Sequence, residues 1–430
     1  MTKYQSILSL RNNTEWQTAT IIARVTSFRR MGNIAFSTVQ SAEAKIQIVL
    51  KKDITPNFKE TCAAIQLGVH ISVSGSRYVT STNELSILAD RVEIVQTANA
   101  GFPDKFHGVT SDETVQRKRY ISTSTDLDAA AVFITRSKII YNIRKFLIER
   151  HDYLEVETPT LMSAASGALA KPFATHSNSM DRDYFLRIAP EIHLKMMIAG
   201  GYHKIFEIGK NYRNEGISKQ HLNEFSMIEW YEVGATYEDN KVLFLELIKY
   251  LLDILGFYDQ ITPYDGNTLD WNNIPTVLYR DLFTQHNLPS PDSLEPSVAD
   301  ELFKKTIRPT IWNPTIIQDY PARMSPLAAK KSDDDSTVAQ WQLIVAGQEI
   351  VKCYNEETSP VIQRKSFEEQ AAQREGGDEE AMMIDEDFLD CLSYGIPSIL
   401  SGLGIGIDRL IAILADKKNI RDVVFSPLMG

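Results

Sequence analysis

The sequence predicts an α+β protein with an N-terminal β-barrel and a larger C-terminal domain of mainly antiparallel strands flanked by helices. Residues from about 17 to 98 contain five short segments of alternating apolar and polar residues, which is typical of half-buried strands. Residues 204–233 and 340–355 have the pattern of antiparallel hairpins, and 129–150 has the period of an amphipathic helix. A chain of 430 residues, of which 43% are hydrophobic, can bury a core in each domain.

The composition limits the class of protein. The formal net charge is −11 at neutral pH, so a nucleic acid would have to bind at a local basic patch. The three cysteines, Cys62, Cys353 and Cys391, have neither the number nor the spacing of a disulfide framework or a zinc site. This usage fits a reducing compartment. The N-terminus has no apolar signal core, and no run of about 18 apolar residues occurs. We therefore expect a cytoplasmic protein without membrane association.

The N-terminal strand segments indicate a small closed barrel of the oligonucleotide-binding (OB) kind. Basic residues surround two phenylalanines, Phe28 and Phe36, that we expect to be exposed. These basic residues are Arg24, Arg29, Arg30, Lys51 and Lys52. Base stacking together with positive charge is what binding of single-stranded nucleic acid requires. The ordinary solvated charges of a barrel would explain the same pattern, so the residues alone leave both interpretations open.

Residues 204–233 are the most informative stretch, and they read as two strands joined by a polar turn. Alternation on the second strand places Phe225, Glu229 and Tyr231 on one face. By the same count Arg213 and Glu215 share a face of the first strand. Burying such charges without a polar ligand would cost several kcal/mol each. The pattern therefore favours a binding site, and a solvated hairpin with chance charges is the alternative.

Three short motifs carry a resemblance to a known family. Residues 213–216 (RNEG), His221, 224–225 (EF) and 229–231 (EWY) resemble the second signature motif of class II aminoacyl-tRNA synthetases, in particular the lysyl-tRNA synthetase branch. Residues 402–409 (GLGIGIDR) resemble the third motif of that family. Residues 154–159 resemble the first motif, which builds the dimer interface in the family. The resemblance covers nearly the whole chain and is weakest between about 262 and 315.

The resemblance implies an organisation and a reaction. Residues 1–98 would be an OB-fold anticodon-binding domain, 99–128 a linker, and 129–430 the class II catalytic domain, with a small, irregular insertion at about 262–315. The family activates lysine with ATP and Mg²⁺ and transfers the lysyl group to tRNA. We therefore expect a lysine–tRNA ligase that works as a homodimer. Lysine, ATP and tRNA are its expected partners.

The resemblance assigns roles at the nucleotide. Arg213 would pair with the substrate carboxylate and the α-phosphate, and a guanidinium group can do so in bidentate fashion. Arg409 and His221 would meet the γ-phosphate. Phe225 would stack on adenine, and Glu215 would accept from the adenine amino group. Positioning and neutralisation of phosphate charge supply most of the catalysis in such a step, so Arg213 and Arg409 are the candidate catalytic residues.

Substrate choice follows from charge. Glu229 and Glu356 are two carboxylates available for the ammonium group of a substrate side chain. Tyr231 and Tyr354 would pack on the aliphatic part of that side chain. Lysine fits this arrangement, whereas arginine would require a differently spaced fork. In the family the position of Glu191 holds the α-ammonium group, although a glutamate early in a helix is also favoured by the helix dipole alone.

The sequence departs from the family pattern at the metal positions. The family has Glu at 342, Asn at 352 and Glu at 349, whereas this chain has Gln342, Lys352 and Glu349. Arg323 also stands where a glutamate is usual. We expect Glu349 and Gln342 to mark the magnesium site. The Lys352 ammonium, within the substrate pocket, would replace part of the metal charge. The alternative interpretation of these departures is lost activity.

By resemblance, the barrel would read the anticodon with Phe36, Gln47 and Glu84. Two rival functions remain open. A paralogue could transfer activated lysine to a protein or lipid, although the presence of the barrel argues against this. A degenerate synthetase could bind RNA or a partner without catalysis. Gln342 and Lys352 favour this second rival, whereas Arg213 and Arg409 argue against it.

Overall fold

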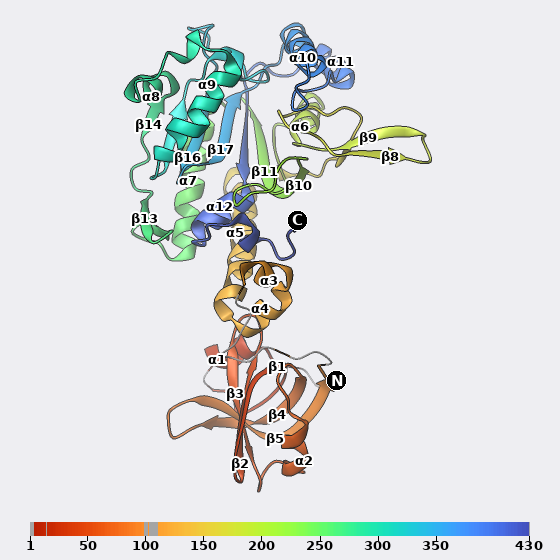
Figure 1. The fold of residues 1–430 in the computed structure, drawn as a ribbon, viewed down its shortest axis with the longest axis vertical. Coiled ribbons are helices and arrows are strands. Elements are labelled where there is room, and N and C mark those ends of the chain that lie inside the picture. Colours follow the sequence, from red (N-terminus) through yellow and green to blue (C-terminus); the bar gives the residue numbers. More distant parts are fainter. Residues whose placement is uncertain (1–3, 14, 99–101, 103–110, 430) are drawn as a thin grey trace. The chain divides into compact units, whose positions relative to one another are not determined.

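The computed structural model describes residues 4–13, 15–98, 102 and 111–429. These residues form two compact units (Figure 1). The first runs to Thr135 and also includes Phe425–Met429, and the second comprises Arg136–Val424. Part of the linker expected at 99–128, namely residues 99–101 and 103–110, lies outside the described part of the chain.

The first unit is built around a closed five-stranded barrel with the strand order β1-β2-β3-β5-β4. Its strands are β1 (Thr18–Met31), β2 (Ile34–Gln40), β3 (Lys45–Lys51), β4 (His70–Val79) and β5 (Leu85–Gln96). Neighbouring strands pair antiparallel, except β3 and β5, which are parallel. The five segments predicted as strands are all strands, so the prediction of a small closed barrel is confirmed.

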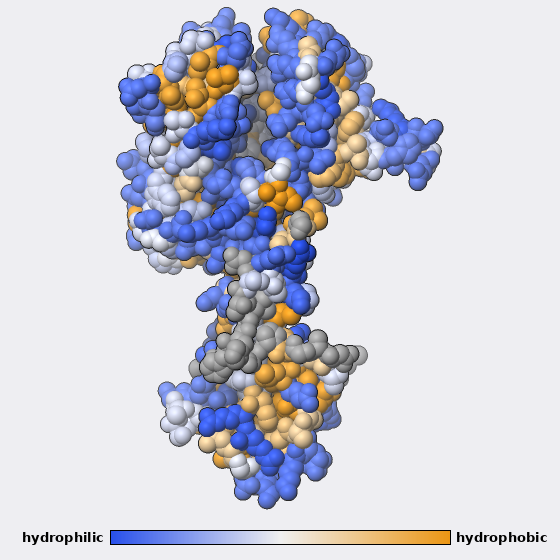
Figure 2. All heavy atoms as spheres, in the orientation of Figure 1, coloured by the Kyte–Doolittle hydropathy of each residue, from blue (hydrophilic) through white to orange (hydrophobic). Residues whose placement is uncertain are grey.

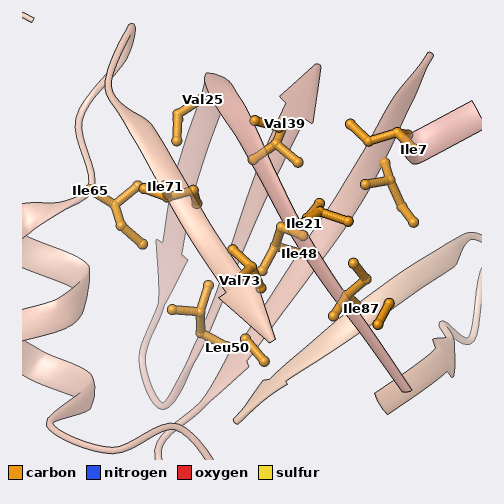
Figure 3. Close-up of a cluster of buried hydrophobic side chains, with 14 of the residues drawn as sticks. Ile7, Ile21, Val25, Val39, Ile48, Leu50, Ile65, Ile71, Val73 and Ile87 are labelled. Carbon is orange, nitrogen blue, oxygen red and sulfur yellow. The ribbon is translucent and has the colours of Figure 1, made fainter. Parts of the chain in front are cut away.

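Alternate residues along the strands fill the barrel (Figure 3). Ile21, Val73 and Ile87 are completely buried, because each occupies an inward position of its strand. Two short helices, α1 (Ile7–Asn12) and α2 (Phe58–Ala64), add Ile7 and Phe58 to the same core. Each such side chain contributes about 1.5–3 kcal/mol to stability by leaving water.

A β-bulge changes the face on which the residues at the end of β1 lie. Val25 pairs with Val39, but the next pair is Ser27 with Thr38, so one extra residue stands between them. Beyond the bulge the alternation is reversed, and Phe28 packs against the barrel core. The prediction that Phe28 is exposed beside Phe36 is therefore wrong.

Three helices follow the barrel. They are α3 (Asp112–Arg117), α4 (Arg119–Thr125) and α5 (Leu127–His151). The helix predicted at 129–150 is confirmed by α5, which continues from the first unit into the second. Its residues Ile139, Ile143 and Leu147 are completely buried, as the spacing of an amphipathic helix requires.

The second unit is organised on an eight-stranded sheet with the order β14-β15-β16-β17-β18-β11-β10-β6. The strands are β14 (Thr276–Leu278), β15 (Thr315–Gln318), β16 (Gln340–Val345), β17 (Gln348–Asn355), β18 (Leu400–Gly406), β11 (Glu224–Val233), β10 (Lys204–Tyr212) and β6 (Leu154–Glu155). The pairs at the two edges, β14 with β15 and β6 with β10, are parallel, and the others are antiparallel. This mainly antiparallel sheet flanked by helices confirms the predicted fold class.

Helices cover the sheet and fix its strands. On α7 (Tyr237–Leu255) a capping box, in which Thr236 and Asp239 bond to each other's backbone amides, sets the helix start. The indole of Trp341 on β16 donates to the carbonyl oxygen of Tyr237 at 2.8 Å, and its ring packs on Phe244 with centroids 5.9 Å apart. Figure 1 shows α6 (Glu191–Ala199), α10 (Pro360–Glu375) and α11 (Glu386–Ser393) grouped together. Directly after β18 comes α12 (Ile407–Leu414).

The segment predicted to be an irregular insertion, about 262–315, contains regular structure. It holds most of the hairpin of β12 (Ile261–Tyr264) and β13 (Asn267–Asp270), two helices, α8 (Tyr279–Gln285) and α9 (Pro296–Leu302), and strand β14 of the main sheet. The Pro and Asn residues that suggested irregularity stand mostly in the short connections. A separate three-stranded sheet has the order β7 (Leu161–Met162), β9 (Arg182–Leu186) and β8 (Ala174–Ser177). Among the described residues, no helix is long and apolar enough to cross a membrane.

Candidate active site

Three neighbouring strands, β17, β18 and β11, form the floor of the candidate site. Gly402, Gly404 and Gly406 alternate along β18, so they leave one face of this strand without side chains. A Cβ atom at Gly402 would collide with the Glu356 carboxylate and the Tyr231 ring. Figure 2 shows a hollow between the surface over α8 and α9 and the surface over α10 and α11. The glycines therefore let polar side chains from both neighbouring strands gather over β18.

A buried polar cluster lies at one end of this floor. The Tyr354 hydroxyl on β17 donates to Oε2 of Glu191 on α6 at 2.6 Å. Nζ of Lys195, one helical turn after Glu191, is 2.8 Å from Oε1 of the same carboxylate. Lys195 also forms an ion pair with Glu356, and all three charged groups are buried. Although burial opposes it, the charges of Glu191 and Glu356 raise the pKa of Lys195, which holds the ammonium group charged.

Glu229 lies in the middle of the floor without a cationic partner in this cluster. On one side it stands opposite Gly404, and on the other opposite Glu207. The Tyr231 hydroxyl donates to Oε2 of Glu229 at 3.0 Å. Burial, followed by the charge of Glu191, raises the pKa of Glu229 to about 8. A carboxyl group in this state favours a ligand that brings a positive charge.

Side chains along β11 alternate between the two faces of the sheet, as the sequence predicts. Glu229 and Tyr231 face the site, whereas the Trp230 indole between them donates to Asn240 of α7 at 2.7 Å on the opposite face. Just beyond the end of the β18 ladder, the Ser226 backbone amide donates to Asp408 at 2.7 Å. The back of the strand is therefore anchored by buried hydrogen bonds, and this holds the front in register.

The loop between β10 and β11 carries Arg213 and Glu215. The prediction that both lie on the first strand is wrong, because β10 ends at Tyr212. The Arg213 amide donates to the Asn223 carbonyl oxygen at 2.8 Å. The Asn223 side chain donates to the carbonyl oxygens of Arg213 and Glu215 at 2.8 and 2.7 Å, so Asn223 fixes the loop. The Arg213 guanidinium lies over the Phe225 ring at 5.1 Å, and its Nε is buried without a hydrogen-bond partner.

His221 and Arg409 belong to the same half of the site. Nη1 of Arg409 donates to the carbonyl oxygen of Glu349 at 2.8 Å. Burial of the His221 ring, followed by the charge of Arg409, lowers the pKa of His221 to about 4. The imidazole is therefore neutral at pH 7, and its Nδ1 lies 2.8 Å from the Ser218 hydroxyl. A neutral imidazole among arginines can donate to a phosphate oxygen without adding further positive charge.

The residues expected at the magnesium site do not form a carboxylate cluster. Gln342 on β16 stands directly opposite Lys352 on β17. The Tyr320 hydroxyl donates to Oε1 of Gln342 at 2.8 Å, so this amide oxygen is already engaged. Glu349 is the one carboxylate among the expected metal positions. The described residues contain no group of three or more His, Cys, Asp or Glu that could hold a metal ion. Since Mg²⁺ prefers hard oxygen ligands in octahedral geometry, this donor set fits it poorly.

Comparisons with known proteins agree with this geometry. Residues 111–430 match the family model of tRNA synthetases class II (D, K and N), and residues 19–95 match that of the OB-fold nucleic acid binding domain. The chain belongs to the class II tRNA synthetases. Among its relatives are the lysine–tRNA ligases of Bacillus subtilis (strain 168), at 37% identity over 95% of this chain and 86% of the relative, and of Moorella thermoacetica (strain ATCC 39073 / JCM 9320), at 36% over 96% and 89%. The lysine–tRNA ligase of Coxiella burnetii (strain Dugway 5J108-111) is 36% identical over 94% and 86%.

In this synthetase, the barrel residues predicted to read the anticodon lie close to one another in the strand register. Phe36 on β2 is half-buried and stands opposite the exposed Arg29. Gln47 on β3 accepts a 3.0 Å hydrogen bond from the Ser86 hydroxyl, and Glu84 is exposed just before β5. Phe36 and Arg29 thus combine an aromatic surface with positive charge.

Three residues in or behind the site of this synthetase were not predicted from the sequence. Lys195 could have been found, because a lysine four residues after a glutamate on one helix pairs with it. Arg136 had no such signal: its Nη1 is 2.5 Å from Oδ1 of Asp408, which is 272 residues away in the chain. Arg308 is the third, and its charge acts on His221 and Arg409 of the site.

Proposed function

We propose that the chain is a lysine–tRNA ligase that forms lysyl-adenylate from lysine and ATP and transfers the lysyl group to tRNA. The observation that carries the proposal is the buried set of carboxylates from Glu191, Glu229 and Glu356 around an open glycine strand. When all three are ionised, the Lys195 ammonium offsets one of the three charges. Two negative charges are left for the two ammonium groups of lysine, which agrees with relatives that are lysine–tRNA ligases.

In the first step a carboxylate oxygen of lysine attacks the α-phosphorus of ATP. A new oxygen–phosphorus bond forms, the bond to the bridging oxygen of the β-phosphate breaks, and pyrophosphate leaves. The Arg213 guanidinium, held over Phe225 and without a partner at Nε, suits the charge that builds up at the α-phosphate. Phe225 offers a ring on which adenine stacks. Glu215, in the same loop, would accept from the adenine amino group.

In the second step a hydroxyl group of the terminal adenosine of tRNA attacks the lysyl carbonyl carbon. The ester bond forms, the bond to the AMP oxygen breaks, and AMP leaves. His221 and Arg409 hold the phosphates during the first step rather than the second. The proposed role of Phe36, Gln47 and Glu84 is to bind the anticodon, so that the correct tRNA presents its end to the site.

Recognition of lysine follows from charge and length. Glu229 and Glu356 bind the side-chain ammonium, Tyr231 and Tyr354 flank the stem, and Glu191 binds the α-ammonium. Discrimination against uncharged analogues could reach about 10⁴-fold, because a missing ammonium leaves buried carboxylates unpaired. Mg²⁺ shields phosphate charge in such reactions, but the residues at its expected positions fit a metal poorly, so no step is assigned to it.

A homodimer is part of the proposal. Tyr141 and Ile148, seven residues apart on α5, are 62% and 43% exposed. Leu154 on the edge strand β6 is 50% exposed, and Arg144 ties the two elements together through an ion pair with Glu155 at 2.8 Å. An apolar stripe of this kind beside a sheet edge fits burial by a second copy. The three free cysteines are consistent with the cytoplasm as the proposed compartment.

The test is ATP–pyrophosphate exchange with a panel of amino acids, followed by charging of tRNA. We expect lysine to drive exchange and tRNA to accept the product. A better response to another amino acid would overturn the specificity. Exchange with lysine but transfer to a protein or lipid instead of tRNA would establish the paralogue, and no exchange with any amino acid would establish a binding protein without catalysis. Light scattering with Tyr141→Asp tests the dimer, which we expect this change to dissociate.

A further inference from the structure

Arg308 is a cation of the nucleotide half that no role above uses. It is the first residue of η3 (Arg308–Thr310), directly after the π-helical turn η2 (Phe303–Ile307). Its Nε is buried without a hydrogen-bond partner. Leaving such a donor unpaired costs about 1–3 kcal/mol. A guanidinium held in this way can bind an anion.

The position of Arg308 is fixed by packing. The Phe303 ring of η2 is buried against Tyr279, with centroids 5.1 Å apart. Beyond Arg308, the Ile311 carbonyl oxygen accepts from the Gly347 amide at 2.8 Å, at the turn between β16 and β17. A Cβ atom at Gly347 would lie only 3.3 Å from Cα of Pro309, so the two segments are in close contact. Arg308 therefore stands at the turn that leads into β17, beside the strand that carries Glu349.

Arg308 belongs to a group of cations with Arg409 and Arg213, near which the carboxylates of Glu349 and Glu215 also lie. Arg409 bonds to the Glu349 carbonyl, two residues after the same turn. The charges of Arg409, Arg308 and Arg213 all act on His221 and lower its pKa. Positive groups gathered in this way repel one another unless an anion with several charges lies between them. A polyphosphate chain has the required charge, and arginine binds phosphate in bidentate fashion.

Lys352 approaches the same region from the sheet. One row across the strands contains Gln342, Lys352, Gly404 and Glu229, each directly opposite the next. Gly404 stands between Lys352 and Glu229 in this row, and it has no side chain to fill the space between the ammonium group and the carboxyl group. The Lys352 Nζ lies 5.6 Å from the centre of the Tyr354 ring.

Tyr320 connects Lys352 to Arg308. Its hydroxyl donates to Gln342, the residue opposite Lys352, at 2.8 Å. The charges of Glu349 and Arg308 both act on the Tyr320 hydroxyl. The expected metal positions thus present one carboxylate, one amide that already accepts a hydrogen bond and one ammonium group, with a guanidinium nearby.

We propose that Arg308 and Lys352 bind the β- and γ-phosphates of ATP directly and supply the positive charge there, so that nucleotide binding depends little on Mg²⁺. The inference rests on the proposed function, because it takes ATP as the substrate. Arg308 binds the terminal phosphates in bidentate fashion through its guanidinium group. Lys352 approaches them from the sheet and binds them as a single point charge. Glu349 remains available to one loosely held cation.

The experiment is calorimetric titration of the full-length protein with ATP and with AMP, each in excess EDTA and in Mg²⁺. We expect ATP affinity in EDTA to lie within about threefold of that in Mg²⁺, since the protein supplies the charge. Arg308→Gln and Lys352→Gln should each weaken ATP binding in EDTA by about 10- to 100-fold and leave AMP binding nearly unchanged. Loss of wild-type ATP binding in EDTA, or equal loss for ATP and AMP in the variants, would overturn the proposal.

Lys305→Gln is the matched control. Lys305 is exposed on the same turn and pairs with Glu301, so ATP affinity should not change. Thermal melting checks that each variant folds. If Arg308→Gln does not fold, Arg308→Lys replaces it, because lysine keeps the charge but cannot bind phosphate in bidentate fashion. We expect Arg308→Lys to bind ATP less tightly than wild type in EDTA. Unchanged binding would overturn the role of Arg308.

A variant designed to make ATP binding depend on Mg²⁺ tests the role of the metal directly. Gln342→Glu combined with Lys352→Asn restores the acid and the amide of the family pattern. We expect ATP binding by this double variant to weaken at least about tenfold on addition of EDTA. Indifference to EDTA would contradict the proposal. These titrations contain neither lysine nor tRNA, so they test the proposed phosphate contacts independently of the proposed function. The titrations can contradict these contacts while lysine still drives exchange, and they can support the contacts while lysine fails to drive exchange.

Discussion

The Tyr354 hydroxyl on β17 donates a 2.6 Å hydrogen bond to Oε2 of Glu191 on α6, across 163 residues of sequence. The other oxygen of this carboxylate accepts from Lys195, so both oxygens are held in place. Each oxygen still has a free lone pair, which allows Glu191 to accept from an ammonium group without moving. The site is therefore arranged before the substrate arrives, which reduces the entropy lost on binding.

Removing either carboxylate of the lysine pocket should impair activation. We expect Glu229→Gln and Glu356→Gln each to reduce lysine-dependent pyrophosphate exchange by about 2–4 kcal/mol in kcat/KM, because a charged, desolvated contact is lost. Glu224→Gln, on the exposed end of the same strand β11, is the control and should behave as wild type. Undiminished exchange in Glu229→Gln would show that this carboxyl group does not hold the lysine side chain.

Lysine binding should release a proton. The pKa of Glu229 is raised to about 8, so the free protein holds this carboxyl group protonated at pH 7. The arriving ammonium favours the ionised form, and its own pKa, about 10.4, keeps it charged. Lysine affinity should therefore rise with pH up to about 8, by at most about tenfold between pH 6 and 7.

Calorimetry at pH 7 in two buffers of different ionisation enthalpy measures this proton. We expect nearly one proton released per lysine in wild type and none in Glu229→Gln. Proton uptake, or release that persists in the variant, would assign the effect to another group.

The barrel should affect tRNA but not lysine activation. Phe36→Ala should weaken tRNA charging by about 1–3 kcal/mol through lost base stacking, and exchange should be unaffected. Phe28→Ala is the informative comparison, because Phe28 packs against the core and its loss should lower the stability of the barrel by about 2–3 kcal/mol. If Phe36→Ala destabilised the barrel to the same degree, Phe36 would be a packing residue rather than a base contact.

The buried pair between Arg136 and Asp408 should be essential for stability. Nη1 of Arg136 is 2.5 Å from Oδ1 of Asp408, and Asp408 is almost fully buried, so Asp408→Asn leaves a poorly compensated guanidinium. We expect the free energy of unfolding to fall by about 3–5 kcal/mol, measured by urea denaturation. Glu386→Gln removes an exposed pair with Arg364 and should change stability little. Equal effects of the two changes would contradict the structural role of Asp408.

Much of the site could be predicted from local pattern. Alternation along 225–233 placed Glu229 and Tyr231 on one face and Trp230 on the other, because side chains in a strand point to opposite sides in turn. The hairpin of β16 and β17 was also predicted with its turn at Ala346 and Gly347. These features depend on neighbours within a few residues, which is the range over which sequence period determines structure.

Other features depended on packing between distant segments. The bulge in β1 turned Phe28 inward, because the barrel core stabilises whichever register buries more apolar surface. Strand β10 ends at Tyr212, and the Asn223 side chain then holds the carbonyl oxygens of Arg213 and Glu215 in a loop.

The sequence by itself determined the fold class, the faces of the active-site strands and the residue types that suit lysine and ATP. Only the tertiary structure decided which charges are already paired and which await a ligand. Lys195 is paired with Glu356 of a distant segment, whereas Arg308 has a buried Nε without a partner. The physical reason is that pairing and desolvation depend on distance in space, and the segments that meet here are more than a hundred residues apart in the chain.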